Sequence, residues 1–302
     1  MLVKNEQKHD LIVYKVKQGG KTLKQVLVDE LNMSIRFLSK LKKDKSIFVN
    51  NQFQRYDYIL KDNDIIKIQI IEESSNFEPE NIDIQILYED FDILVINKPS
   101  NIVVHPTKSH PNNTIANALA YYFKTKGENV RIRFVNRLDM NTSGLLIVAK
   151  NSYAHHILSE DMKQNKVTKK YLAVVKGVVK EDFKTINAPI YRETDDSILR
   201  SVDERGQKSI THLKTVQRLK DSTIVELLLE TGRTHQIRVH LSYIGYPIIG
   251  DELYGYVDED LIKRQALHAI ELEFLQPRTK EKIHITAQIP DDMQNLINKL
   301  RK

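Results

Sequence analysis

Residues 131–151 read RIRFVNRLDMNTSGLLIVAKN. The apolar run at residues 145–149 is typical of a strand that is buried on both faces. Asp139 comes before this run, ahead of the polar turn residues 141–144. A carboxylate held at the end of a rigid strand is well placed for chemistry, but an aspartate before a turn often serves only to form that turn. The stretch predicts a buried strand and leaves both interpretations of Asp139 open.

A helix is predicted within the segment TGRTHQIRVHLSYIG, residues 231–245. Thr234 is a suitable N-cap, and Gly245 followed by Pro247 would end the helix. Apolar residues recur at helical spacing at Ile237, Leu241 and Ile244. Arg238 lies beside this apolar face. Because a buried, unpaired charge is very costly, Arg238 needs a partner.

The chain from residue 84 onward mixes strand and helix patterns. The segment KKYLAVVKG (169–177) alternates as a strand does, with Tyr171 near its open end. The segment ILYEDFDILVINKPSNIVVHP (86–106) contains two hydrophobic strand patterns, separated by residues 97–100. Strands and helices alternate without a repeated βαβ unit, so this part predicts a domain of mixed α and β structure.

The excess positive charge is concentrated at the N-terminus. Residues 1–70 carry 14 Lys and Arg against 8 Asp and Glu, whereas the rest of the chain carries 32 of each. The N-terminal part therefore accounts for the whole net charge of +6. A basic module suggests binding of a polyanion, but a solvated lysine-rich surface would carry the same charge.

The same N-terminal part has the pattern of a compact α/β module. A strand is expected at residues 11–17, followed by a helix capped by Thr22 and a second helix capped by Ser34. Two strands follow, at SIFVN (46–50) and DIIKIQI (64–70). Three residues of the second helix are expected to point inward: Ile35, Leu38 and Leu41.

Residues 20–72 resemble the RNA-binding domain named after small-subunit ribosomal protein S-four. The resemblance rests on the basic second helix, on SIFVNN at the turn into a strand, and on the strand that begins at residues 64–66. Asn51 and Asp62-Asn63 stand where the family usually has glycine, and both residue types tolerate left-handed turns. The candidates for RNA phosphate contacts lie at helical spacing on the second helix: Arg36, Lys40 and Lys43.

Residues 72–83, EESSNFEPENID, are acidic and polar and lack apolar periodicity, which is typical of a linker. We therefore expect an RNA-binding domain at residues 1–72, a linker at residues 73–83 and a larger domain at residues 84–302. The expected fold class is α+β: a small α/β domain beside a larger one of mixed structure.

Six segments within residues 84–290 resemble, in the same order, the RluA-type family of pseudouridine synthases. They are YEDFDILVINKPSNIVVHP, RLDMNTSGLLIVAKN, KKYLAVVKG, TGRTHQIRVHL, PIIGDELYG and QALHA. One departure is Asn136, where many relatives have His, although an amide can still hydrogen-bond the loop. The resemblance implies that the larger domain is a catalytic domain with a mixed, largely antiparallel β-sheet and flanking helices. It also implies that the chain isomerises specific uridines in RNA to pseudouridine.

The resemblance implies roles for individual residues. Asp139 matches the essential aspartate, which attacks the ribose anomeric carbon or removes a neighbouring sugar proton. Arg238 matches the arginine that pairs with it and favours its ionised form. Tyr171 matches the tyrosine that stacks on a flipped-out base, and its hydroxyl is a candidate for the final proton transfer at C5. Arg137 would fill the space left by the base or bind its phosphate. The other candidates for substrate contact are Leu267, as an apolar wall, Arg233 and Asn136.

This reaction consumes no redox equivalent, phosphate or methyl group, so no cofactor is expected. The chain has neither a P-loop nor a dinucleotide-binding glycine loop. It also has no cysteine, which excludes disulfides and thiolate chemistry. No metal is expected, because His235 and His240 do not share a helical face and no metal-binding spacing occurs.

Two other functions are compatible with parts of the sequence. A non-enzymatic RNA-binding or ribosome-assembly protein would use the large domain as a scaffold, but it would not need Asp139, Tyr171 and Arg238 together. A hydrolase acting on RNA would need a metal–carboxylate cluster or a pair of histidines, which the sequence does not offer.

The expected partner is RNA. Relatives with this N-terminal domain commonly act on large-subunit ribosomal RNA, and transfer RNA is the alternative. The charged N-terminus does not fit a signal peptide, and no stretch reaches the ~20 apolar residues of a membrane span. A cytoplasmic monomer without membrane contact is therefore expected.

Overall fold

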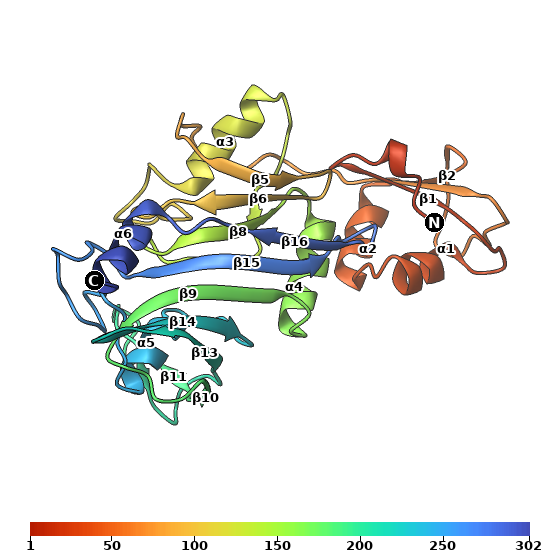
Figure 1. Ribbon diagram of the computed structural model, residues 1–302. Coiled ribbons are helices and arrows are strands. Elements are labelled where there is room, and N and C mark those ends of the chain that lie inside the picture. The colour runs from red at the N-terminus through yellow and green to blue at the C-terminus, as the bar shows by residue number, and fades with distance from the viewer.

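The computed structural model describes residues 1–302, and its strands form two main sheets at opposite ends of the molecule (Figure 1). The smaller sheet has four strands in the order β1-β4-β2-β3. Its elements are a 3-10 turn (Lys4–Glu6), β1 (Leu11–Lys15), α1 (Leu23–Gln25), a π-helical turn (Val26–Glu30), α2 (Ile35–Lys43), β2 (Ile47–Val49), β3 (Gln52–Phe53) and β4 (Ile65–Gln69).

Both predicted helix starts in the N-terminal part are confirmed. The Thr22 side chain accepts a hydrogen bond from the backbone of Gln25 in a capping box, and Ser34 caps α2 by accepting from the backbone of Phe37. The inward orientation of Ile35 was wrong, because 64% of this residue is exposed and Phe37 is buried instead. At ~100° per residue, positions 37, 38 and 41 lie within about 100° of arc, and position 35 falls outside it.

The N-terminal part packs directly against the larger part. Its hydrophobic cluster of 19 buried residues includes Tyr153 and Ile157 of α4 (Ser152–Lys163). The Tyr153 hydroxyl donates to the carbonyl of Leu31 at 2.9 Å. Arg278 donates to the carbonyl of Leu11 at 2.7 Å. The division at residues 72 and 83 stays a prediction, but the two parts share buried contacts.

The segment proposed as a linker has no regular secondary structure, but it contacts the larger part along its length. The Ser75 hydroxyl accepts from the backbone of Ile132 at 2.8 Å, and the carbonyl of Glu78 accepts from the side chain of Asn117 at 2.8 Å. The segment is therefore docked rather than free.

The larger sheet has ten strands, ordered β10-β13-β14-β9-β15-β8-β6-β5, with β16 paired to β15 and β7 to β8. All its pairings are antiparallel except that of β15 with β8, so the predicted mixed, largely antiparallel sheet is confirmed. The strands are β5 (Gln85–Glu89), β6 (Ile93–Lys98), β7 (Arg133–Phe134), β8 (Ser143–Ala149), β9 (Thr168–Lys176), β10 (Phe183–Asn187), β13 (Ile210–Arg218), β14 (Ser222–Leu229), β15 (Leu267–Leu275) and β16 (Lys282–Thr286). A separate small pair comprises β11 (Ile190–Tyr191) and β12 (Ser201–Val202).

Besides α4, the helices that flank this sheet are α3 (Ile115–Thr125), α5 (Gln236–Tyr243) and α6 (Asp291–Leu300) (Figure 1). Strand β8 lies inside the sheet with all seven of its residues buried, which confirms the predicted buried strand. None of the helices is both long and apolar enough to cross a membrane.

The two strand patterns expected within residues 86–106 were partly wrong. The two strands there, β5 and β6, form a hairpin that ends at Lys98, and residues 101–106 contain only an isolated bridge from Val103 to Thr114. Pro99 has no backbone N–H to donate to a neighbouring strand, which fits the end of β6 at this point. Lys98 therefore belongs to a buried strand rather than to a surface turn.

Candidate active site

Two buried cations hold the loop that carries Asp139, between β7 and β8. Lys98, which is fully buried, donates to the carbonyls of Met140 at 2.8 Å, Pro99 at 2.8 Å and Ile102 at 2.9 Å. Arg264 donates to the carbonyl of Asn141 at 3.1 Å. The two backbone carbonyls that follow Asp139 are thus each held by a buried positive charge, which restricts where the carboxylate can lie.

The strand after this loop begins at a close contact with β15. Gly144 has a φ of +113°, and a Cβ atom there would lie 2.3 Å from the carbonyl oxygen of Ala269. Only glycine fits this position, because both the backbone conformation and the space exclude a side chain. The contact brings Leu267, at the start of β15, to the same end of the sheet as Asp139.

Arg238 of α5 joins two aspartates. Its Nη1 donates to Asp139 Oδ2 at 3.1 Å, while Nε and Nη2 donate to the two carboxylate oxygens of Asp251 at 2.7 and 2.8 Å. Asp251 is fully buried and also accepts from the backbone of Leu253 and Tyr254. The paired geometry with Asp251 fixes the plane of the guanidinium, and the remaining nitrogen points at Asp139.

Two aspartates set the protonation state of Arg238. Burial alone would lower the pKa of Arg238, but the hydrogen bonds and attraction to Asp251 and Asp139 outweigh it and raise that pKa above its ordinary value. Arg238 is therefore a permanent cation at the side of Asp139.

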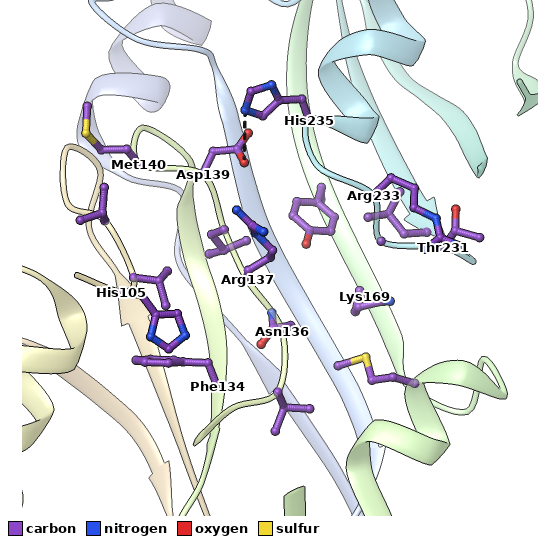
Figure 2. Close-up of a pocket in the computed structure, with 18 of the residues that line it drawn as sticks. His105, Phe134, Asn136, Arg137, Asp139, Met140, Lys169, Thr231, Arg233 and His235 are labelled. Carbon is purple, nitrogen blue, oxygen red and sulfur yellow. Dashed lines mark ion pairs between the residues drawn. The ribbon is translucent and has the colours of Figure 1, made fainter. Parts of the chain in front are cut away.

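His235 lies near the other oxygen of the Asp139 carboxylate (Figure 2). Its Nδ1 shares a hydrogen bond of 2.8 Å with the hydroxyl of Tyr254, and its Nε2 lies 4.0 Å from Asp139 Oδ1. Burial lowers the pKa of His235 more than Asp139 raises it, so the imidazole is neutral at neutral pH. At 4.0 Å it makes no hydrogen bond with Asp139, and it forms one wall beside the carboxylate.

The start of α5 differs from the prediction. Thr234 is not the N-cap, because His235 occupies that position with a left-handed φ of 58° and no side-chain cap. The Gln236 side chain accepts from the backbone of Arg233 and from the hydroxyl of Thr231. This side chain ties the loop before α5 together but does not cap the helix, whose first N–H, that of Gln236, donates to the carbonyl of Arg233 at 3.1 Å. The left-handed residue places the imidazole beside the pocket. The predicted end is confirmed, since α5 stops at Tyr243 and Gly245 has a φ of +82°.

Asp139 opens into a cavity of about 910 Å³ (Figure 2). Tyr171 of β9 lines it and is 6% exposed. Burial, and to a smaller extent the charge of Asp139, raise the pKa of Tyr171 above its ordinary value, so this side chain is a phenol at neutral pH. A smaller adjoining hollow is lined by Tyr171, Arg238 and Leu267. Asp139, Tyr171 and Arg238 therefore lie around one connected space.

The other predicted substrate residues lie partly at the rim of the cavity and partly in its wall. Arg137 and Arg233 are exposed at the rim of the cavity, and Arg233 Nε donates to the carbonyl of Lys208 at 3.3 Å. Asn136 lines the cavity, but its amide accepts from the backbone of Ile147 at 2.8 Å and donates to the carbonyl of Leu145 at 3.3 Å. This amide thus satisfies backbone groups of β8, and its role as a substrate contact stays a prediction.

The predicted RNA contacts of the N-terminal part lie on α2 (Figure 1), and none of them lines this cavity. Arg36, Lys40 and Lys43 are all exposed. Lys40 is 3.7 Å from Glu72, a loose ion pair that an RNA phosphate could replace.

Sequence reasoning missed Asp251, Lys98 and Arg264. Asp251 left a signal, because Arg238 required a partner and Asp251 follows a buried apolar pair and a glycine. Lys98 and Arg264 left none, because the partners of Lys98 are backbone carbonyls and Arg264 pairs with Asp292, 28 residues along the chain. No group of three or more His, Cys, Asp or Glu side chains is arranged to hold a metal ion.

Comparison with known proteins shows the family. The sequence model of RNA pseudouridylate synthases matches residues 92–243. An uncharacterized RNA pseudouridine synthase of Bacillus subtilis is 41% identical over 271 residues, which are 89% of this chain and 95% of the relative. Ribosomal large subunit pseudouridine synthase D of Haemophilus influenzae is 40% identical over 244 residues, which are 76% of this chain and 75% of that protein.

A solved structure agrees. Human RNA pseudouridylate synthase domain containing 1 superposes with a TM-score of 0.57 at 28% identity, covering 76% of this chain and 98% of that one. The sequence and the fold lead to the same assignment: the chain belongs to the RluA-type family of RNA pseudouridine synthases and is an isomerase that acts on uridine in RNA.

Proposed function

We propose that this enzyme modifies uridines of large-subunit ribosomal RNA and uses Asp139 as its catalytic carboxylate. The observation that carries the role of Asp139 is its contact of 3.1 Å with the buried Arg238, at the mouth of the cavity that Tyr171 lines. The proposed target is supported by the relatives named as large-subunit synthases, one of which is 40% identical over 76% of this chain.

In the proposed reaction the bond between C1′ and N1 of the uridine breaks, the uracil turns, and a bond forms between C1′ and C5. The proton on C5 leaves and N1 gains a proton, so nothing is consumed and no cofactor is needed. Asp139 either attacks C1′ or removes a proton from the neighbouring sugar carbon, and both roles require the carboxylate form. Arg238 holds one carboxylate oxygen through its hydrogen bond of 3.1 Å.

Tyr171 has the position to stack on a uracil that enters the cavity. A flipped-out base is commonly held between aromatic or apolar side chains, and Leu267 supplies an apolar surface in the adjoining hollow. Because the raised pKa keeps Tyr171 a phenol, it can accept the C5 proton only if its own proton leaves in the same step. We therefore assign stacking as its first role.

The N-terminal part is proposed to hold RNA through its S-four-like module. Arg36, Lys40 and Lys43 lie on the face of α2 opposite its buried side. The expected monomeric state stays a prediction.

The first experiment incubates the protein and its Asp139→Asn variant with total RNA from cells that lack the enzyme, without added cofactor. Ribosomal and transfer RNA are then separated, and new pseudouridine is mapped by carbodiimide modification and reverse transcription. Pseudouridine at defined positions of large-subunit ribosomal RNA, formed by the native protein alone, is the expected result. Equal product from both proteins would refute the role of Asp139, and product confined to transfer RNA would refute the target.

The role of α2 is tested by replacing Arg36, Lys40 and Lys43 together by Gln. Each lost phosphate contact lowers the slope of log K against log salt concentration by roughly one. Lys42→Gln is the matched control, because Lys42 is exposed on the same helix but lies about 100° or more away from the three. Substitution is preferable to removal of residues 1–72, which would expose Tyr153 and Ile157. An unchanged salt slope in the triple variant would refute the contact.

A further inference from the structure

Three lysine side chains are buried in this protein, and only one of them has no partner. Lys98 donates to three carbonyls, and Lys150 pairs with Glu89 and Glu128, each at 2.8 Å. Lys169 is 8% exposed, and its side chain makes no hydrogen bond and no ion pair within the chain, although its Nζ is open to the cavity. Because burial of a charge is costly and no anion of the chain offsets that cost, an anion from outside the chain would stabilise the ammonium.

Lys169 faces the cavity that contains Asp139 (Figure 2). It lies two residues before Tyr171 on β9, and side chains two residues apart share one face of a strand. Two residues span roughly 7 Å along a strand, so the ammonium stands beside a base stacked on Tyr171 rather than over it. Lys170 points to the opposite face, where it pairs with Glu271 at 3.0 Å.

The surroundings favour an anion. The cavity wall also carries Arg137, Lys163 and Arg233, all of which are cations. Its two acidic residues are already engaged: Asp139 contacts Arg238, and Glu230 contacts His212 at 2.7 Å. The volume of about 910 Å³ lies near the upper end of the ~300–1,000 Å³ typical of ligand pockets, which leaves room for more than a single base.

RNA offers one anionic group, its phosphodiester. We propose that Lys169 binds a phosphodiester that flanks the target uridine and thereby seats the flipped-out nucleotide against Tyr171 and Asp139. The inference rests on the proposed function, since it names a further substrate contact in the same site. Burial lowers the pKa of Lys169, and a phosphate at its Nζ would favour the charged form. Such a charge-assisted contact in a partly dry cavity is strong.

The test uses the full-length protein and a ribosomal RNA hairpin that contains a mapped target uridine. Lys169→Met keeps the apolar stem and removes the charge, so kcat/KM should fall about tenfold, as expected for loss of a charged hydrogen bond, mainly through KM. Lys169→Arg should restore most of the lost activity. The control, Lys170→Met, should stay within about twofold of the native enzyme because its side chain faces away from the cavity. Equal losses in Lys169→Met and Lys170→Met would overturn the proposal.

A second arm neutralises the phosphate instead of the lysine. Hairpins are made with a single uncharged methylphosphonate on the 5′ or the 3′ side of the target uridine. One of them should lower kcat/KM of the native enzyme about tenfold, and Lys169→Met should then cause no further loss on that hairpin. The inference is wrong if neither linkage matters to the native enzyme, or if the two losses multiply. The comparison of hairpins with the native enzyme does not depend on whether the variant folds normally.

Failure of the proposed function would look different. If the native enzyme forms no pseudouridine in any ribosomal RNA, the salt dependence of its binding to ribosomal RNA fragments still tests Lys169. The slope of log K against log salt should be smaller by roughly one in Lys169→Met than in the native protein. Equal slopes would overturn the phosphate contact whatever the target of the enzyme proves to be.

Discussion

Lys98 is a buried lysine whose replacement should change both the pH dependence of the free energy of unfolding and the rate of the reaction at Asp139. Its ammonium donates to three carbonyls, one of them that of Met140 next to Asp139. Burial lowers the pKa of Lys98 from its ordinary 10.5 to about 7, and only the charge of Asp139 opposes that shift. Lys98→Met keeps a long unbranched side chain in the same space and removes all three hydrogen bonds.

The size of the effect on stability follows from the pKa. Below pH 7 this lysine is protonated in both the folded and the unfolded chain, so it adds no pH dependence. Between pH 7 and 10.5 the unfolded chain holds a proton that the folded chain has lost, so the free energy of unfolding rises with pH. At 1.36 kcal/mol per pKa unit, the native protein should gain about 2.7 kcal/mol from pH 6 to pH 9 relative to Lys98→Met.

The assay is urea denaturation of both proteins at pH 6, 7.5 and 9. Other titrating groups are common to both proteins and cancel in the difference. A difference in unfolding free energy that stays constant from pH 6 to 9 would refute the reasoning. Single-turnover rates on a mapped hairpin give the second readout. A displacement of ~1 Å at a reacting group costs about 100-fold, so a comparable loss of rate is expected in Lys98→Met.

Three further substitutions test the framework of the site. Asp251→Asn leaves the buried Arg238 incompletely paired, so the free energy of unfolding measured by urea denaturation should fall by about 3 kcal/mol. Single-turnover rates should also fall. Gly144→Ala places a methyl group against the backbone of β15 at a φ of +113°. Urea denaturation followed by circular dichroism should show that the free energy of unfolding falls by more than about 4 kcal/mol. Tyr153→Phe removes the hydrogen bond to Leu31 and should cost about 1 kcal/mol, with faster proteolysis at residues 73–83.

Each of these expectations has a contrary outcome. Native-like stability and rates in Asp251→Asn would mean that Arg238 does not depend on this aspartate. A normally stable Gly144→Ala would show that β8 and β15 can separate without cost. Unchanged proteolysis in Tyr153→Phe would mean that the N-terminal part is held by other contacts.

Local features were predictable because their causes lie within one turn of chain. The caps at Thr22 and Ser34 and the helix end before Gly245 depend on residues three or four positions away. The buried strand β8 was evident from its unbroken apolar run. Two local expectations were wrong. His235, in a left-handed conformation, took the N-cap position expected of Thr234, and Phe37 took the inward position assigned to Ile35.

Some residues of the site were predictable, but from resemblance to a family rather than from local sequence patterns. Resemblance to a family brought Asp139, Tyr171 and Arg238 together as candidates, although no periodicity links residues 99 positions apart. It also suggested Asn136 as a substrate contact, which stays a prediction, and it gave no sign that this amide also binds the backbone of β8.

Sequence by itself determined the fold class, most of the elements near the site, the family and the candidate catalytic carboxylate. Only the tertiary structure decided which charges neutralise one another: Asp251 holds Arg238, backbone carbonyls hold Lys98, and Lys169 is left facing the cavity without an anion. The physical reason is that periodicity and capping report short-range preferences, whereas the free energy of a charge depends on its burial and on distances that exist only in the folded chain.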